Sequence, residues 1–177
     1  HLAIFITDYF TRPEKRQGAW MEQLKASWVN ADGSVERPII YNVGNYAPPT
    51  ADAPSLLSID DVQTTFHEFG HGLHGMLSRA RLKSQSGTNV DRDFVEFPSQ
   101  FHEHWAFQPE LLAEYAHHYK TGELIPDSLV RQVNAASKHN MGFMTAELAG
   151  AALLDLAWGH YDPAVDGPVD VDAFEAK

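Results

Sequence analysis

The strongest constraint on the fold is a helical periodicity between residues 59 and 77. Apolar side chains recur there at steps of three and four residues, which is the spacing of one helix face. They are Ile59, Val62, Phe66, Phe69, Leu73, Met76 and Leu77. Ser58 stands directly before this stripe and Asp61 follows three residues later, which is the signature of an N-terminal cap. The stretch therefore predicts a long amphipathic helix that begins after Ser58.

The first part of the chain predicts strands, and the second half predicts helices. Segments rich in β-branched and aromatic residues, each ending before a proline, predict strands at residues 1–10 and 38–46. Residues 12–37 stay ambiguous, because the turn at Asp32-Gly33 joins either two short strands or a strand and a helical turn. Polar residues 79–91 predict a surface loop. Further helices are expected at residues 94–107, with a kink at Pro98, and at residues 109–120, 127–140 and 143–161. The fold class is α+β and helix-dominated, with a small N-terminal sheet and an all-helical C-terminal half.

Composition narrows the functional classes. A length of 177 residues favours one domain over residues 1–177, and the acidic tail at 162–177 is expected to fray. A formal net charge of −11 argues against nucleic acid as a partner. No apolar run approaches the roughly 20 residues of a membrane span, so no membrane partner is expected. The lack of cysteine excludes disulfides and thiolate metal sites and suits a reducing, cytoplasmic location. Because the chain starts at His1 inside an apolar segment, we expect it to be a fragment.

The predicted helix at residues 59–77 contains the motif H-E-x-x-H, formed by His67, Glu68 and His71. Histidines four residues apart lie about 40° apart on a helix and one turn apart in height, so two imidazoles can bind one metal ion. The Glu68 side chain leaves the helix in a direction next to that of the histidines. A general base needs this placement if it is to reach a metal-activated water without being a ligand. By chance the motif is expected about 0.03 times in a chain of this composition. The competing interpretation is an amphipathic helix whose histidines are merely capped or solvated.

A tetrahedral metal site with two histidines and a water needs one more protein ligand. His74 lies about 10 Å along the helix axis from His67, so these two side chains cannot share one ion. Metzincins are excluded, because their pattern requires glycine where this chain has His74 and histidine where it has Leu77. The next predicted helix offers Glu96 and Glu103, seven residues apart on one face, and spacing does not choose between them.

Two segments together resemble the thimet-oligopeptidase-like zinc metallopeptidases. They are FHEFGHGLHGMLS at residues 66–78 and SGTNVDRDFVEFPSQFHEHWA at residues 86–106. The resemblance implies a zincin-like catalytic domain with one Zn²⁺ per chain, bound by His67, His71 and Glu96, and Glu68 as the general base. Glu103 is left as a carboxylate that orients a ligand imidazole, or as an ordinary solvated or ion-paired helix residue.

The resemblance also implies hydrolysis of short peptides, with C-terminal dipeptides as one form of product. Members of the family are several times longer and carry a segment rich in His and Tyr, with the pattern Gly-Tyr-x-Ala, that binds substrate. His160-Tyr161 does not match it, because Asp162-Pro163 follows, and the pair is interpreted as structural. The expected partners are therefore short peptides and the remaining segments of the parent enzyme. The alternative is a catalytically incompetent fragment that only binds zinc or serves as a structural helical domain.

Two further segments have candidate roles. Strand 39–46 either offers main-chain groups to an extended peptide or is a plain core strand. The loop at Gly87 either closes on substrate or is an ordinary surface loop.

Overall fold

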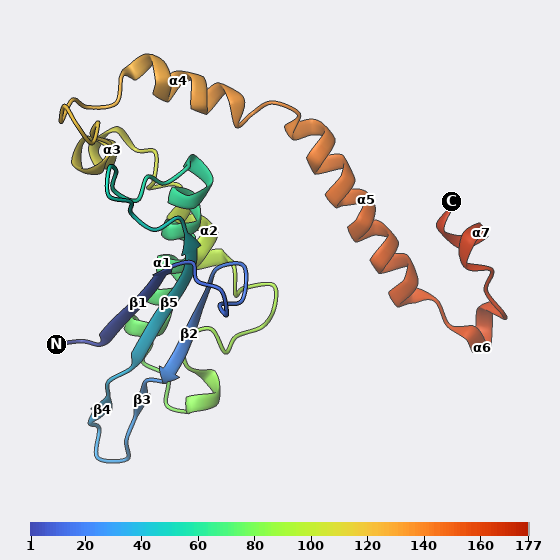
Figure 1. Ribbon diagram of the computed structural model, residues 1–177. Helices are drawn as coiled ribbons and strands as arrows, with labels where there is room; N and C mark the ends of the chain where they lie inside the picture. The colour runs from blue at the N-terminus through green and yellow to red at the C-terminus, as the bar shows by residue number, and fades with distance from the viewer. Residues whose placement is uncertain (177) are drawn as a thin grey trace. The chain divides into compact units, whose positions relative to one another are not determined.

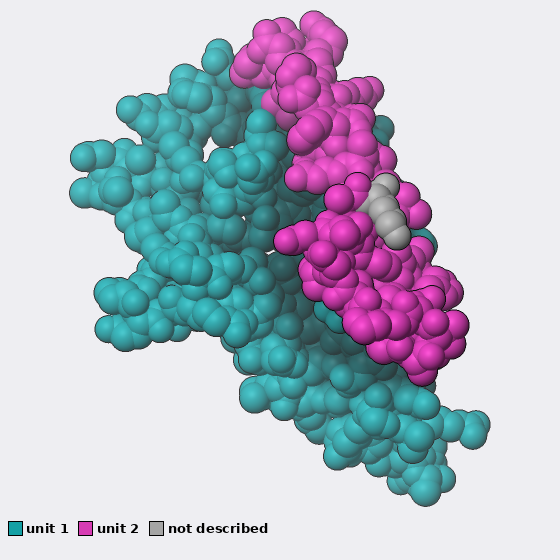
Figure 2. Space-filling model, turned by 90° about the vertical axis from the view of Figure 1, so that its right-hand side faces the viewer, with its two compact units in different colours: residues 1–125 teal, residues 126–177 magenta. Residues whose placement is uncertain are grey.

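The computed structural model describes residues 1–176 and has a mixed α+β architecture. The chain divides into two compact units, residues 1–125 and 126–177 (Figure 2). The first unit contains every described strand together with helices α1 to α3, and the second contains helices α4 to α7. None of the helices within residues 1–176 combines the length and the apolar character that crossing a membrane requires.

The first unit is built on a three-stranded sheet with the order β1-β5-β2 (Figure 1). Strands β1 (Ile4–Phe10) and β5 (Ile39–Tyr46) run parallel, and β2 (Trp20–Lys25) is antiparallel to β5. The predicted strands at 1–10 and 38–46 are therefore confirmed with slightly shorter bounds. Because β5 is paired on both sides, its main chain has no free edge for a peptide, and the plain core strand is the correct interpretation of residues 39–46.

The ambiguous segment 12–37 contains β2 and a small hairpin. Strands β3 (Trp28–Val29) and β4 (Val35–Glu36) pair antiparallel around the predicted turn at Asp32-Gly33. Gly33 has φ of +82°, a conformation that glycine adopts without steric cost. The first of the two alternatives, a turn between two short strands, is confirmed.

Helix α1 (Ile59–Leu77) packs on the sheet and carries the predicted cap. The Ser58 hydroxyl accepts from the Asp61 amide, and the Asp61 carboxylate accepts from the Ser58 amide. Small residues allow the close approach to the sheet, since a Cβ on Gly75 would lie 2.8 Å from Ile40 Cδ1. Ile40 is fully buried, and with Val43 and Tyr46 it makes β5 the centre of the apolar core.

Three of the predicted helices are shorter than expected. Helix α2 is Phe97–Glu103, helix α3 is Pro109–Tyr115 and helix α4 is Asp127–Ala136. The bounds 94–107 and the kink at Pro98 were wrong, because α2 begins at Phe97 and Pro98 lies in its first turn, where no intrahelical donor is lost. Residues before it form turns in which the amides of Phe94 and Val95 bond to the Asp91 carbonyl.

The loop at residues 79–91 is held by hydrogen bonds to other parts of the first unit. It contains a short 3₁₀ helix, η1 (Lys83–Gln85), followed by buried Ser86 and Gly87. The Gly87 amide donates to Ser78 Oγ at 3.0 Å, and Gln23 Nε2 donates to the Ser86 carbonyl at 3.2 Å. Gly87 has φ of +58°, and a Cβ there would lie 2.7 Å from Gln23 Oε1. These contacts hold residues 86–87 in place, while most of the other residues of the loop are exposed, as predicted for a surface loop.

The second unit is helical and consists of α4, α5 (Met141–His160), α6 (Pro163–Asp166) and α7 (Val171–Glu175). Short helices thus occupy part of segment 162–176, for which a frayed tail was predicted, and Lys177 lies outside the described residues. The Phe174 ring packs on Trp158 with centroids 4.2 Å apart, which ties α7 to the end of α5.

Candidate metal centre

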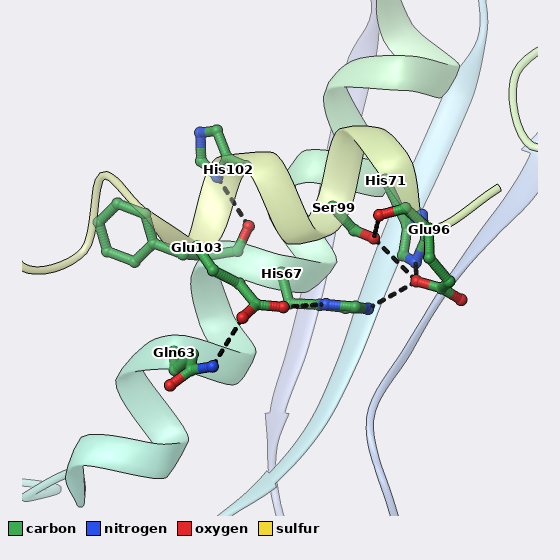
Figure 3. A network of polar contacts seen from close by, with 8 residues as sticks. Gln63, His67, His71, Glu96, Ser99, His102 and Glu103 are labelled. Carbon is green, nitrogen blue, oxygen red and sulfur yellow. Dashed lines mark hydrogen bonds and ion pairs between the residues drawn. The ribbon is translucent and has the colours of Figure 1, made fainter. Parts of the chain in front are cut away.

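Helix α1 and the start of α2 bring three predicted site residues together (Figure 3). His67 Nε2 and His71 Nε2 each lie 3.1 Å from the same oxygen of Glu96, Oε2. One ligand atom from each of these residues falls within 4.8 Å of the others. Two ligands of a tetrahedral zinc ion are roughly 3.3 Å apart when each bond is about 2.0–2.1 Å. The spacing and the donor types therefore suit one divalent metal ion.

Glu96 reaches this position because α2 begins directly after it. Its backbone is in the αR region at the N-cap position, and Ser99, one turn later, donates its hydroxyl to Glu96 Oε2 at 2.8 Å. Burial raises the pKa of Glu96, but the Ser99 hydrogen bond and the charges of His71 and His67 outweigh that effect and hold it below the usual value. Glu96 is thus kept as an anion whose oxygen faces both imidazoles.

The two nitrogens of His67 both face carboxylates. Nε2 faces Glu96, and Nδ1 lies 2.7 Å from Glu103 Oε1. Carboxylates only accept hydrogen bonds. If the imidazole is neutral and donates from Nδ1 to Glu103, its Nε2 lone pair faces the Glu96 carboxylate, which is also an acceptor, and the two repel. A cation between Nε2 and Glu96 would remove this conflict, as would a second proton on His67, so the arrangement is compatible with a metal at this point.

His71 is the more enclosed of the two histidines, with 8% of its surface exposed. Burial lowers its pKa, so its neutral form, the form that binds metals, is favoured. Its Nδ1 is buried and has no hydrogen-bond partner among residues 1–176.

Glu68 lies beside these groups on α1 and is also 8% exposed. Burial raises its pKa, the Glu96 charge raises it further, and the His67 charge lowers it. Its Oε2 has no partner among the described residues. Glu68, His67 and Glu103 line an open recess of about 450 Å³, together with Ala19, which directly precedes β2, and with Asp60, Gln63 and Thr64. The Glu68 carboxyl group therefore borders a space that is also lined by His67, one of the three clustered residues.

The close approach of α1 and α2 depends on Gly70. A Cβ on this residue would lie 2.7 Å from Ser99 Cα and 2.9 Å from the Pro98 carbonyl oxygen. On the next turn of α2, His102 Nδ1 lies 2.7 Å from the Phe66 carbonyl oxygen. Sequence reasoning did not single out Gly70, Ser99 or His102. The apolar periodicity could not indicate them, because none of the three has an apolar side chain, although His102 packs against the stripe residues Phe66 and Phe69.

His74 and His160 do not belong to the three clustered residues. His74 packs edge-on against Phe94 with centroids 6.1 Å apart, and burial lowers its pKa. Tyr161 packs against Trp158 and Phe174 in the second unit and donates to the Gly167 carbonyl. These contacts agree with a structural interpretation of the His160-Tyr161 pair.

A family model described as "Peptidase family M3" matches residues 1–176. The chain belongs to peptidase family M3. Dipeptidyl carboxypeptidase of Escherichia coli (strain K12) is 48% identical over 177 residues, which are 99% of this chain and 25% of that protein. The Salmonella typhimurium protein of the same name is 47% identical over 165 residues, covering 93% of this chain and 24% of its own. Oligopeptidase A of Escherichia coli is 43% identical over 136 residues, which are 76% of this chain and 20% of that protein. This M3 chain thus spans about a quarter of the length of these peptidase relatives, and the resemblance to an oligopeptidase family is confirmed.

Proposed function

We propose that this chain provides the metal site and the general base of a zinc-dependent peptidase that hydrolyses short peptides. The observation that carries the proposal is the convergence of His67, His71 and Glu96 beside the buried carboxyl group of Glu68. Membership of family M3 supports the peptidase class, and the H-E-x-x-H helix packed on a sheet supports a zincin-like domain.

In this proposal His67 and His71 bind Zn²⁺ through Nε2, and Glu96 binds it through its carboxylate. A zinc ion held there would supply Lewis acidity, which makes water a nucleophile near neutral pH and polarises a carbonyl group. Glu103 accepts from His67 Nδ1 and orients that ring. The distances of 2.7 and 3.1 Å on the two sides of His67 support this assignment.

Glu68 performs the proton transfers. It takes a proton from the attacking water as the new carbon–oxygen bond forms, and it later gives that proton to the leaving amine as the carbon–nitrogen bond breaks. Its raised pKa makes the carboxylate a stronger base in the first step, and the proton that it gains there is the one that it gives to the amine in the second step. No covalent bond between enzyme and substrate forms.

Several finer assignments accompany this proposal. We propose that residues 1–177 belong to one catalytic domain, because the family match runs through both compact units. Release of C-terminal dipeptides is supported by the name of the 48% identical relative. A cytoplasmic location is supported by a 39% identical Arabidopsis thaliana relative named "Probable cytosolic oligopeptidase A". Short peptides and the remaining segments of a longer enzyme are the proposed partners.

The test measures zinc and turnover in the natural full-length protein. We expect about one zinc per chain after stripping, resupply and desalting, and a loss of zinc in Glu96→Ala. Glu68→Gln should keep the zinc and lose peptide hydrolysis. Glu114→Gln is a matched control, because Glu114 is exposed on α3 and far from the site in sequence. Hydrolysis by Glu68→Gln at the wild-type rate would contradict the proposed base.

The same measurements on the isolated 177-residue chain address the alternative of a domain that binds zinc without catalysis. The observation that favours this alternative is that the chain spans only a quarter of its relatives. Zinc at one per chain with no hydrolysis would support it for the isolated chain. A chain without zinc would restrict the proposal to the longer protein.

A further inference from the structure

Glu103 joins two residues of α1 through its two carboxylate oxygens (Figure 3). Oε1 lies 2.7 Å from His67 Nδ1, and Oε2 accepts from Gln63 Nε2 at 2.6 Å. Gln63 and His67 are four residues apart, so they stand one above the other on the same face of the helix. A single side chain from α2 therefore bridges one full turn of α1.

Gln63 is the partner that holds the second oxygen. Among the described residues, the only ion pair of Glu103 is with His67, and Gln63 provides its other side-chain hydrogen bond. A glutamate with one hydrogen bond can still rotate about its terminal torsion, which is broad and has no sharp staggered minima. Hydrogen bonds to both oxygens restrict that rotation and keep Oε1 directed at His67.

We propose that Gln63 is a positioning residue for the metal site. Its amide holds Glu103, Glu103 keeps the proton of His67 on Nδ1, and the Nε2 lone pair is left free on the side of Glu96. The inference rests on the proposed function, since it assigns a role to a residue behind a proposed ligand. Glu103 can orient the ring of His67 but not that of His71, because Nδ1 of His71 has no partner within residues 1–176.

The experiment measures zinc affinity by competition with a chelator in the natural full-length protein, and melting of the metal-free form in parallel. Gln63→Leu removes the amide with little change in size, and Gln63→Lys restores a donor. Gln100→Leu is the matched control, since Gln100 is an exposed glutamine on α2 that makes none of the side-chain hydrogen bonds of the site. The zinc dissociation constant is a readout that does not depend on turnover.

We expect Gln63→Leu to weaken zinc binding about 10-fold. This is the lower end of the range measured when a residue that supports a metal ligand through hydrogen bonds is removed. Gln63→Lys and Gln100→Leu should bind zinc like the wild type, and the metal-free proteins should all melt at the same temperature. Unchanged affinity in Gln63→Leu would overturn the inference. A different result would also overturn it: Gln63→Leu loses zinc affinity, its metal-free form melts at a lower temperature, and Gln63→Lys does not restore the affinity. That pattern indicates a general structural role for Gln63. A wild-type protein that binds no zinc would overturn the proposed function as well.

Discussion

Replacing Gly70 by alanine tests whether the closeness of α1 and α2 creates the metal centre. The added Cβ would lie 2.7 Å from Ser99 Cα, 2.9 Å from His102 Cβ and 2.9 Å from the Pro98 carbonyl oxygen. Two of these three atoms belong to the backbone of α2, so a change of rotamer cannot relieve the contacts. The helices must separate, and separation carries Glu96 away from the two histidines on α1.

The expected destabilisation follows from two opposing effects. Overpacking costs about 1–3 kcal/mol, and contacts with the backbone put this site at the upper end of that range. Alanine in a helix interior is about 1 kcal/mol more favourable than glycine, so the net loss is about 2 kcal/mol. In a chain of this size such a loss lowers the melting temperature by roughly 4–8 °C. Zinc affinity should fall as well, because the ligands no longer share one point.

Urea unfolding and chelator competition measure the two effects. Gly150→Ala is the matched control, because Gly150 lies in the interior of α5 and a Cβ there meets no atom within 4 Å. This variant should gain up to about 1 kcal/mol and keep its zinc affinity. If Gly70→Ala were as stable as Gly150→Ala and bound zinc as tightly as the wild type, the argument from close approach would be refuted.

Three further predictions concern the site and its surroundings. Glu103→Ala should weaken zinc binding about 10- to 100-fold, because His67 loses the acceptor at Nδ1; chelator competition measures this. Zinc at 100 times its dissociation constant should stabilise the protein by about 2.7 kcal/mol, and a chelator should abolish the resulting rise in melting temperature. Hydrogen bonds from Arg12 and Lys15 lower the pKa of Asp8 from 3.8 to about 2. The folded state therefore binds fewer protons than the unfolded state in this range, so the stabilisation is complete above pH 3.8 and is lost as the pH falls towards 2. Asp8→Asn should be less stable than the wild type at pH 7, with the difference in unfolding free energy vanishing in that window.

Local sequence patterns predicted those elements whose capping or turn residues lie within a few positions of one another. The cap of α1 is an example, because Ser58 and Asp61 bond to each other's backbone and need no other part of the chain. The turn at Asp32-Gly33 is another, since glycine supplies the positive φ that the hairpin requires. The length of α2 could not be predicted in this way. Turns formed with the Asp91 carbonyl precede it, and Pro98 is equally acceptable in a first turn and at a kink.

The same distinction explains what could be predicted of the site. The pairing of His67 with His71 is a property of one helix, so their spacing alone brought them together as a hypothesis. Glu96 and Glu103 lie on one face at the spacing of two turns, so periodicity treats them as equivalent. In the structure Glu96 meets both Nε2 atoms, whereas Glu103 meets His67 Nδ1. The choice depends on how α2 lies across α1, which is a tertiary contact.

The burial of α1 shows why that contact is hard to find from sequence. Its buried residues are Glu68, Gly70, His71, Gly72 and Gly75, and the members of the apolar stripe are only partly covered or exposed. Hydrophobic periodicity identifies a helix, but it predicts that the large apolar side chains are the buried ones. Here glycines let the sheet and α2 approach the helix backbone, and the polar residues between those glycines become enclosed. Enclosure raises the pKa of Glu68 and lowers that of His71, so the packing that hides these residues from a hydrophobic pattern also favours a stronger base and a neutral, metal-binding imidazole.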